Sequence, residues 1–155
     1  MGLWGWMSAF GPGEMTEIEG RLTSHQYVDI LEHVMLPSVR AMLIPPPQQI
    51  YIAMDNAPIH NSQAVKEWFT DHPKVSRISW PPKSPDMMPI EHLWAKMTKK
   101  WDENVPRNKE NLILHAKQIW DEIRSEDLCH KLVMSMSSGI REVVNKGGYS
   151  TKYYS

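Results

Sequence analysis

Two carboxylates, Asp55 and Glu91, stand where the backbone would hold each of them still. Asp55 follows the apolar run 50–54, which is typical of a buried strand, and open α/β sheets place their chemistry where such a strand enters a loop. Glu91 comes two residues after Pro89, and because proline favours the first helical position, Glu91 belongs to the first turn of a helix. Two fixed carboxylates on separate elements can share a hard divalent cation such as Mg²⁺. Taken singly, each has a structural alternative: a turn residue at a strand end, and an acidic charge favoured by the helix dipole.

Hydrophobic spacing predicts the elements that must position these two residues. A short helix between strands at 50–54 and 75–80 makes a parallel βαβ unit, so Asp55 and the loop after residue 80 emerge at the same edge of the sheet. In the helix that Pro89 opens, apolar residues recur at helical spacing and Glu91 lies at the border of that stripe. The pattern therefore predicts that Glu91 looks along the sheet edge toward Asp55.

Local signals predict the remaining elements. A hairpin turning at Gly11-Pro12-Gly13 begins the chain. A helix follows, opened by a capping box at Thr23 and ended or kinked at Pro37. Two later helices are expected, with Asn108 and Ser125 as their respective N-caps.

Composition indicates one globular domain. The chain has 155 residues, 41% hydrophobic and 23% charged, with a net charge of −1. We expect a single domain over 1–148 and a loose tail over 149–155. A single cysteine excludes an internal disulfide and a multi-thiolate zinc site. Because signal-peptide and membrane-spanning patterns are not seen, the sequence predicts an intracellular protein with no membrane partner, whose nucleic-acid contacts must come from local clusters.

Two motifs, DNAPIH at 55–60 and WPPKSPDMMPIEHLW at 80–94, resemble the catalytic core of mariner-type transposases. The Trp4-Gly5 start, the segment 22–31 and the ending 131–153 are similar to further parts of that core, so the resemblance covers nearly the whole chain. These transposases belong to the DDE superfamily. The resemblance implies an α/β fold, with a ribonuclease-H-like mixed sheet flanked by helices and truncated at its N-terminal strand.

The resemblance also implies a function. Such enzymes cut DNA at transposon ends and join those ends to target DNA, using three carboxylates that hold two Mg²⁺ or Mn²⁺ ions. By motif position, Asp55 is the second of these acids and Glu91 the third. Asn56 and His60 occupy motif positions beside the metals, either as support for the active-site loop or in contact with substrate. DNA, a nuclear location, and a second copy or a full-length transposase as partner are further implications.

Departures from the family pattern bear on activity. The family's first aspartate lies on a strand upstream of the Trp-Gly segment, and no residue of this chain stands for it. We therefore expect weak metal binding and little or no cleavage by this chain alone. The same strand would pair between the hairpin and the strand before Asp55, so unpaired edges and self-association are expected. Met87-Met88 replaces the family's Leu-Asn, which removes a cap from the helix that carries Glu91.

Four lysines are candidates for contact with DNA phosphates: Lys83, Lys96, Lys99 and Lys100. A charged helix face is at least as often only solvated. Two functions stay open. One is a transposase catalytic-domain fragment, and the other is a non-catalytic, domesticated or remnant domain that binds nucleic acid or protein. The missing aspartate favours lost activity, whereas the intact Asp55 and Glu91 favour descent from an active enzyme.

Overall fold

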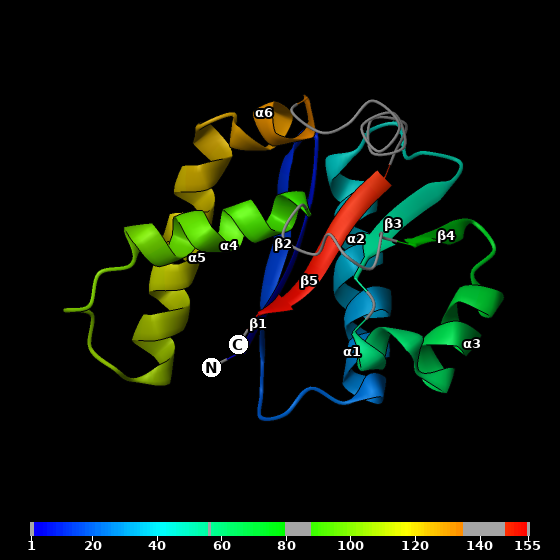
Figure 1. The fold of residues 1–155 in the computed structure, drawn as a ribbon, viewed down its shortest axis with the longest axis horizontal. Helices are drawn as coiled ribbons and strands as arrows, with labels where there is room; N and C mark the ends of the chain where they lie inside the picture. Colours follow the sequence, from blue (N-terminus) through cyan, green and yellow to red (C-terminus); the bar gives the residue numbers. More distant parts are fainter. Residues whose placement is uncertain (1, 56, 80–87, 135–147, 155) are drawn as a thin grey trace.

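The computed structural model describes residues 2–55, 57–79, 88–134 and 148–154. A five-stranded sheet in the order β2-β1-β5-β3-β4 runs through the molecule, with helices on both of its faces (Figure 1). β1 is antiparallel to β2 and β5, whereas β3 is parallel to β4 and β5. The predicted mixed α/β sheet flanked by helices is confirmed. The strands are β1 (Gly2–Ser8), β2 (Gly11–Ile18), β3 (Ile50–Met54), β4 (Val75–Ser79) and β5 (Gly148–Tyr154).

The hairpin of β1 and β2 is confirmed, but its turn lies at Ala9 and Phe10 rather than at 11–13. Residues 11–13 already belong to β2. Gly13 is needed there for packing, because a Cβ at this position would lie 1.9 Å from Cε2 of Trp6. The glycine at position 13 is therefore required by the close approach of the Trp6 ring to β2 and not by a turn.

A long helical segment follows the hairpin and covers one face of the sheet. It consists of α1 (Ser24–Ile30), a π-helical turn η1 (Leu31–Met35) and α2 (Leu36–Met42). The capping box is confirmed, since Thr23 Oγ1 accepts from the Gln26 amide at 3.2 Å and the Thr23 amide donates back to Gln26 Oε1 at 2.9 Å. Pro37 does not end the helix. Proline lacks the amide hydrogen of a regular turn, and the widened π turn ends at Met35, two residues before Pro37.

The predicted parallel βαβ unit is confirmed, with a short 3₁₀ turn η2 (Pro58–Asn61) and then α3 (Gln63–Asp71) between β3 and β4. The other face of the sheet carries α4 (Pro89–Lys100), α5 (Lys109–Ser125) and α6 (Leu128–Met134). Within the described residues, no helix combines the length and the apolar character that crossing a bilayer requires.

Of the N-caps predicted for these helices, Asn108 is confirmed and Ser125 is not. Met88 occupies the N-cap of α4 without a side-chain hydrogen bond, as the replaced asparagine led us to expect. Asn108 caps α5 by accepting from the Asn111 amide at 2.9 Å. Ser125 does not cap the next helix. It ends α5, and its hydroxyl donates to the Glu122 carbonyl of its own helix, which is a common alternative for serine near a helix terminus.

The structure differs from the predicted loose tail, because Gly148–Tyr154 forms β5 in the middle of the sheet (Figure 1, red). β5 lies between β1 and β3, which is where the sequence predicted unpaired edges. Tyrosine and threonine favour strands, and pairing on both sides satisfies backbone groups of β1 and β3 that would otherwise stay open. The edges next to β1 and β3 are thus closed within the chain itself.

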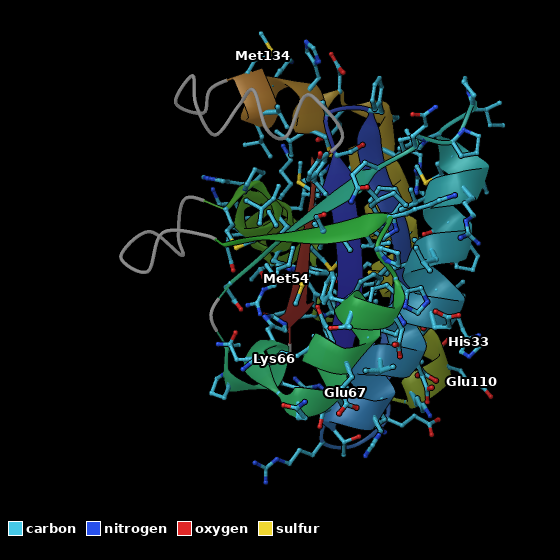
Figure 2. The ribbon with its side chains drawn as sticks, turned by 90° about the vertical axis from the view of Figure 1, so that its right-hand side faces the viewer. His33, Met54, Lys66, Glu67, Glu110 and Met134 are labelled. Carbon is cyan, nitrogen blue, oxygen red and sulfur yellow. The ribbon has the colours of Figure 1, made fainter. Side chains whose placement is uncertain are left out.

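The sheet separates two apolar cores. Residues of α1, η1, α2 and α3 pack with Ile52 and Met54 on one face, and Met54, labelled in Figure 2, is fully buried. Residues of α4, α5 and α6 pack with Ala53 on the other face. Alternation along β3 therefore assigns Tyr51 and Ala53 to the face of α4, and Asp55 comes next in this series.

Candidate active site

Asp55 follows β3 directly and is held by its own loop. Its Oδ1 accepts a hydrogen bond from the Ala57 amide at 3.1 Å and lies 2.7 Å from Nδ1 of His60. The amide contact two residues ahead is the usual way for an aspartate to close a turn. With a side chain only 18% exposed, Asp55 is a fixed carboxylate at the carboxyl end of a strand, as predicted.

His60, at the end of η2, is 1% exposed and supports this carboxylate from within the protein. Its Nδ1 faces two acceptors, Oδ1 of Asp55 at 2.7 Å and the Asp55 carbonyl oxygen at 3.1 Å, so the ring hydrogen belongs on Nδ1. Nε2 is buried and finds no hydrogen-bond partner in the described part of the chain. The ring packs against Tyr27 with 4.9 Å between centroids. Of the two roles that the resemblance left open for His60, support of the loop fits this buried position.

Arg77, in the middle of β4, secures the same loop and was missed from the sequence. Its Nη1 donates to the His60 carbonyl at 2.7 Å and to Asn61 Oδ1 at 2.8 Å, and its Nη2 donates to the Asp55 carbonyl at 3.0 Å. Burial lowers the pKa of the Arg77 guanidinium, and the charges of Tyr27 and Asp55 act in the opposite direction. The one available signal was a lone arginine inside the strand VSRIS.

Glu91 lies in the first turn of α4, where its amide donates to the Met88 carbonyl at 3.0 Å. The side chain is partly exposed, and its Oε1 is buried. α4 packs against β1 and β5, and β5 is the neighbour of β3. Asp55 and Glu91 therefore belong to adjoining parts of the same face of the sheet, while the convergence of their carboxyl groups on one cation stays a prediction.

The donor set for a divalent cation is incomplete in the described ranges. Carboxylate oxygens of Asp55 and Glu91 are the ligand type that Mg²⁺ and Mn²⁺ prefer. However, no group of three or more His, Cys, Asp or Glu side chains is placed to hold a metal in residues 2–55, 57–79, 88–134 and 148–154. Oδ1 of Asp55 already accepts two hydrogen bonds, and the Arg77 guanidinium lies behind its backbone carbonyl. These residues do not form a complete metal centre.

Contacts of the four lysines with DNA stay a prediction, and two of these lysines form ion pairs within the chain. Lys96 Nζ lies 3.3 Å from Glu126 Oε2, and Lys100 Nζ lies 2.8 Å from Glu126 Oε1 and 3.5 Å from Glu122 Oε2. These ion pairs join α4 to the end of α5, and the hydrogen bond with Lys100 lowers the pKa of Glu126. Lys99 is exposed on the same helix.

Two further predicted residues, Asn56 and Lys83, fall outside the described residues.

The matching family model is described as DDE superfamily endonuclease, and it covers residues 3–113, which is most of the chain. The chain belongs to this family, as the motifs predicted.

Among curated relatives, the Tcb1 transposase of Caenorhabditis briggsae is 31% identical and the Tc1 transposase of Caenorhabditis elegans 30% identical, each over 151 residues. The alignments cover 97% of this chain and 54% of each relative, so the chain spans about half the length of these transposases. The resemblance to mariner-type transposases is thereby confirmed.

Solved structures agree on the fold. The Mos1 mariner paired end complex with Mn matches with a TM-score of 0.74 at 17% identity, over 94% of this chain and 43% of that one. The catalytic domain of Mos1 mariner transposase matches with a TM-score of 0.69 at 19% identity, over 94% and 73% of the two chains. The predicted ribonuclease-H-like fold is the fold of that catalytic domain.

Proposed function

We propose that this chain is the catalytic core of a Tc1/mariner-type transposase, and that Asp55 and Glu91 belong to the site that acts on DNA with a divalent metal. The observation that carries the proposal is the position of Asp55, fixed at the end of β3 by His60 and Arg77 in a fold shared with a transposase catalytic domain. Glu91, on the helix over the neighbouring strand, supports the same site.

The chain is impaired as a nuclease when it acts alone. The resemblance implies three carboxylates, whereas in the described part of the chain no group of three or more His, Cys, Asp or Glu side chains is placed to hold a metal ion. A second copy or a full-length transposase would be its protein partner, DNA its substrate and the nucleus its location. The Mos1 protein has been solved in a complex with a transposon end, which supports DNA as the partner here.

DNA binding and cleavage test the proposal separately. Fluorescence anisotropy with a labelled duplex should show binding at about 50 mM salt that weakens steeply by about 200 mM, because phosphate contacts release counterions. Supercoiled plasmid with Mn²⁺ should be nicked slowly at most, and Glu91→Gln should abolish that nicking. Glu110→Gln is the matched control, since Glu110 is an exposed first-turn acid on α5 (labelled in Figure 2).

Two results would count against these statements. A failure to bind DNA at low salt would contradict the assignment to DNA chemistry. Efficient nicking that Glu91→Gln abolishes would confirm the site but refute the impairment.

A further inference from the structure

Four charged side chains join α4 to the end of α5, the helix that it crosses in Figure 1. Glu126 holds two lysines at once, with Oε1 at 2.8 Å from Lys100 Nζ and Oε2 at 3.3 Å from Lys96 Nζ. Glu122, one turn earlier on α5, lies 3.5 Å from the same Lys100. We call Glu122 and Glu126 the acidic pair, and Lys96 and Lys100 the paired lysines.

The groups of this network that bond most closely are charged at neutral pH. The hydrogen bond with Glu126 raises the pKa of Lys100, and the hydrogen bond with Lys100 lowers the pKa of Glu126. Each shift favours the ionised form of its group. The acidic pair therefore cancels the charge of the paired lysines. The exposed Lys99 has no ion pair with any residue that the structure describes.

The network lies at the surface, where it can open. Its side chains keep between 29% and 60% of their exposure, and ion pairs as exposed as these stabilise a protein little because water and salt screen them. A lysine carries its charge on a flexible four-carbon stem, so its ammonium group can exchange a carboxylate for another anion while the helix stays in place. The phosphate groups of DNA are such anions. The acidic pair and a DNA backbone would thus compete for the same ammonium groups.

We propose that the paired lysines and Lys99 form a surface for the DNA backbone, and that the acidic pair is an internal competitor that occupies two of these three lysines until phosphate groups displace it. The proposal rests on the proposed function, because it takes DNA as the partner. It goes further in naming the residues that limit the affinity of this surface. If the acidic pair served only to join α4 to α5, its removal would lower stability and leave DNA binding unchanged.

Fluorescence anisotropy of the full chain with a labelled DNA duplex, at about 100 mM salt, is the test. Glu126→Gln should bind the duplex several-fold more tightly than the unmodified chain, because glutamine keeps the shape of the side chain and releases both lysines. Glu110→Gln is the matched control, since it removes the same charge from an exposed position in the first turn of α5. Glu110 lies about 24 Å from Glu126 along the helix, well beyond the screening length of about 10 Å, so its affinity should stay within about twofold.

The salt dependence and a combination of variants show whether the paired lysines cause the gain. Each added phosphate contact steepens the slope of log affinity against log salt by about 0.9, so Glu126→Gln should steepen it by about one to two. Changing Lys96 and Lys100 together to glutamine should weaken DNA binding only slightly in the unmodified chain, where both already have partners. The same two changes should abolish the gain in Glu126→Gln.

The proposal is overturned if Glu126→Gln folds and binds DNA no more tightly than Glu110→Gln, or if its gain survives the loss of both paired lysines. Should Glu126→Gln fail to fold by circular dichroism, Glu122→Gln decides, and an unchanged affinity refutes the proposal. Equal DNA affinity of all variants would refute the internal competitor and leave the proposed function standing. A gain in Glu126→Gln, together with nicking that Glu91→Gln does not reduce, would uphold the competitor and refute the proposed function.

Discussion

The contact between Asp55 and His60 should be measurable as a coupling free energy. A hydrogen bond of 2.7 Å between a carboxylate and an imidazole that is 1% exposed is charge-assisted and shielded from water. Such bonds contribute roughly 1.5–3 kcal/mol. A double-mutant cycle of Asp55→Ala and His60→Ala should therefore give a coupling in this range at neutral pH, because the cycle cancels the cavity that each alanine leaves.

Urea unfolding followed by tryptophan fluorescence supplies the four free energies of the cycle. His60→Asn and His60→Leu form a matched pair, since an asparagine amide can donate from the position of Nδ1 and leucine cannot. We expect His60→Asn to keep part of the coupling to Asp55. Both variants lose the contact of the ring with Tyr27, worth about 0.5–1.5 kcal/mol, so that loss does not separate them. A coupling below about 0.5 kcal/mol, or equal stability of the two variants, would refute the supporting role of His60.

Three further perturbations follow from the packing. Arg77→Met removes a fork of hydrogen bonds to the loop after β3 and should lower the free energy of unfolding by about 2–4 kcal/mol, whereas a loss under about 1 kcal/mol in urea would contradict the role of Arg77. Gly13→Ala should lower the free energy of unfolding by about 3 kcal/mol, because its Cβ would lie 1.9 Å from the Trp6 ring. Gly20→Ala should lower it by about 1 kcal/mol, because Gly20 has a φ of +63. Thermal melts in which Gly20→Ala is the less stable variant would show that the clash at Gly13 is relieved. Burial raises the pKa of Cys129 to about 12, so its thiol stays protonated at pH 8. Iodoacetamide should therefore label Cys129 at least tenfold more slowly in the folded chain than in urea. Equal labelling rates would disprove the burial.

Local rules predicted most of the elements that position the site. The capping residues Thr23 and Asn108 act within their own helical turns, so the sequence alone identifies them. Hydrophobic spacing likewise predicted the parallel unit of β3 and β4, in which Asp55 follows the first strand. Ser125 was misassigned because its hydroxyl can bond backward as easily as forward, and only packing decides between the two.

The central strand could not be predicted in the same way. β5 pairs with β1 and β3, which are far away in the sequence, and a short polar and aromatic segment after two glycines looks like a tail when read alone. Strand pairing depends on the edges that the rest of the fold leaves open. Here β1 and β3 leave one strand position between them, and the last strand of the chain occupies it.

In the site as well, contacts between residues close in the sequence could be predicted, and contacts between distant residues could not. Motif spacing placed Asp55 and His60 in one loop, and the structure joins them. Arg77 escaped notice because it bonds to backbone carbonyl oxygens 17 and 22 residues away, which no side-chain motif records. The DNA contacts of Lys96 and Lys100 stay a prediction. Their ion pairs with Glu126 could not be foreseen from the sequence, because that carboxylate lies at the far end of another helix.

Paramagnetic broadening by Mn²⁺ in the amide spectrum of the ¹⁵N-labelled chain tests most directly whether Asp55 and Glu91 face one cation. Weak binding suits this measurement, because an ion in fast exchange broadens every amide that lies close to its site. We expect the amides of Asp55 and Glu91 to broaden together at the lowest Mn²⁺ concentrations, and both effects to vanish in Asp55→Asn. Broadening of only one of the two, or earlier broadening around Glu122 and Glu126, would contradict a shared site.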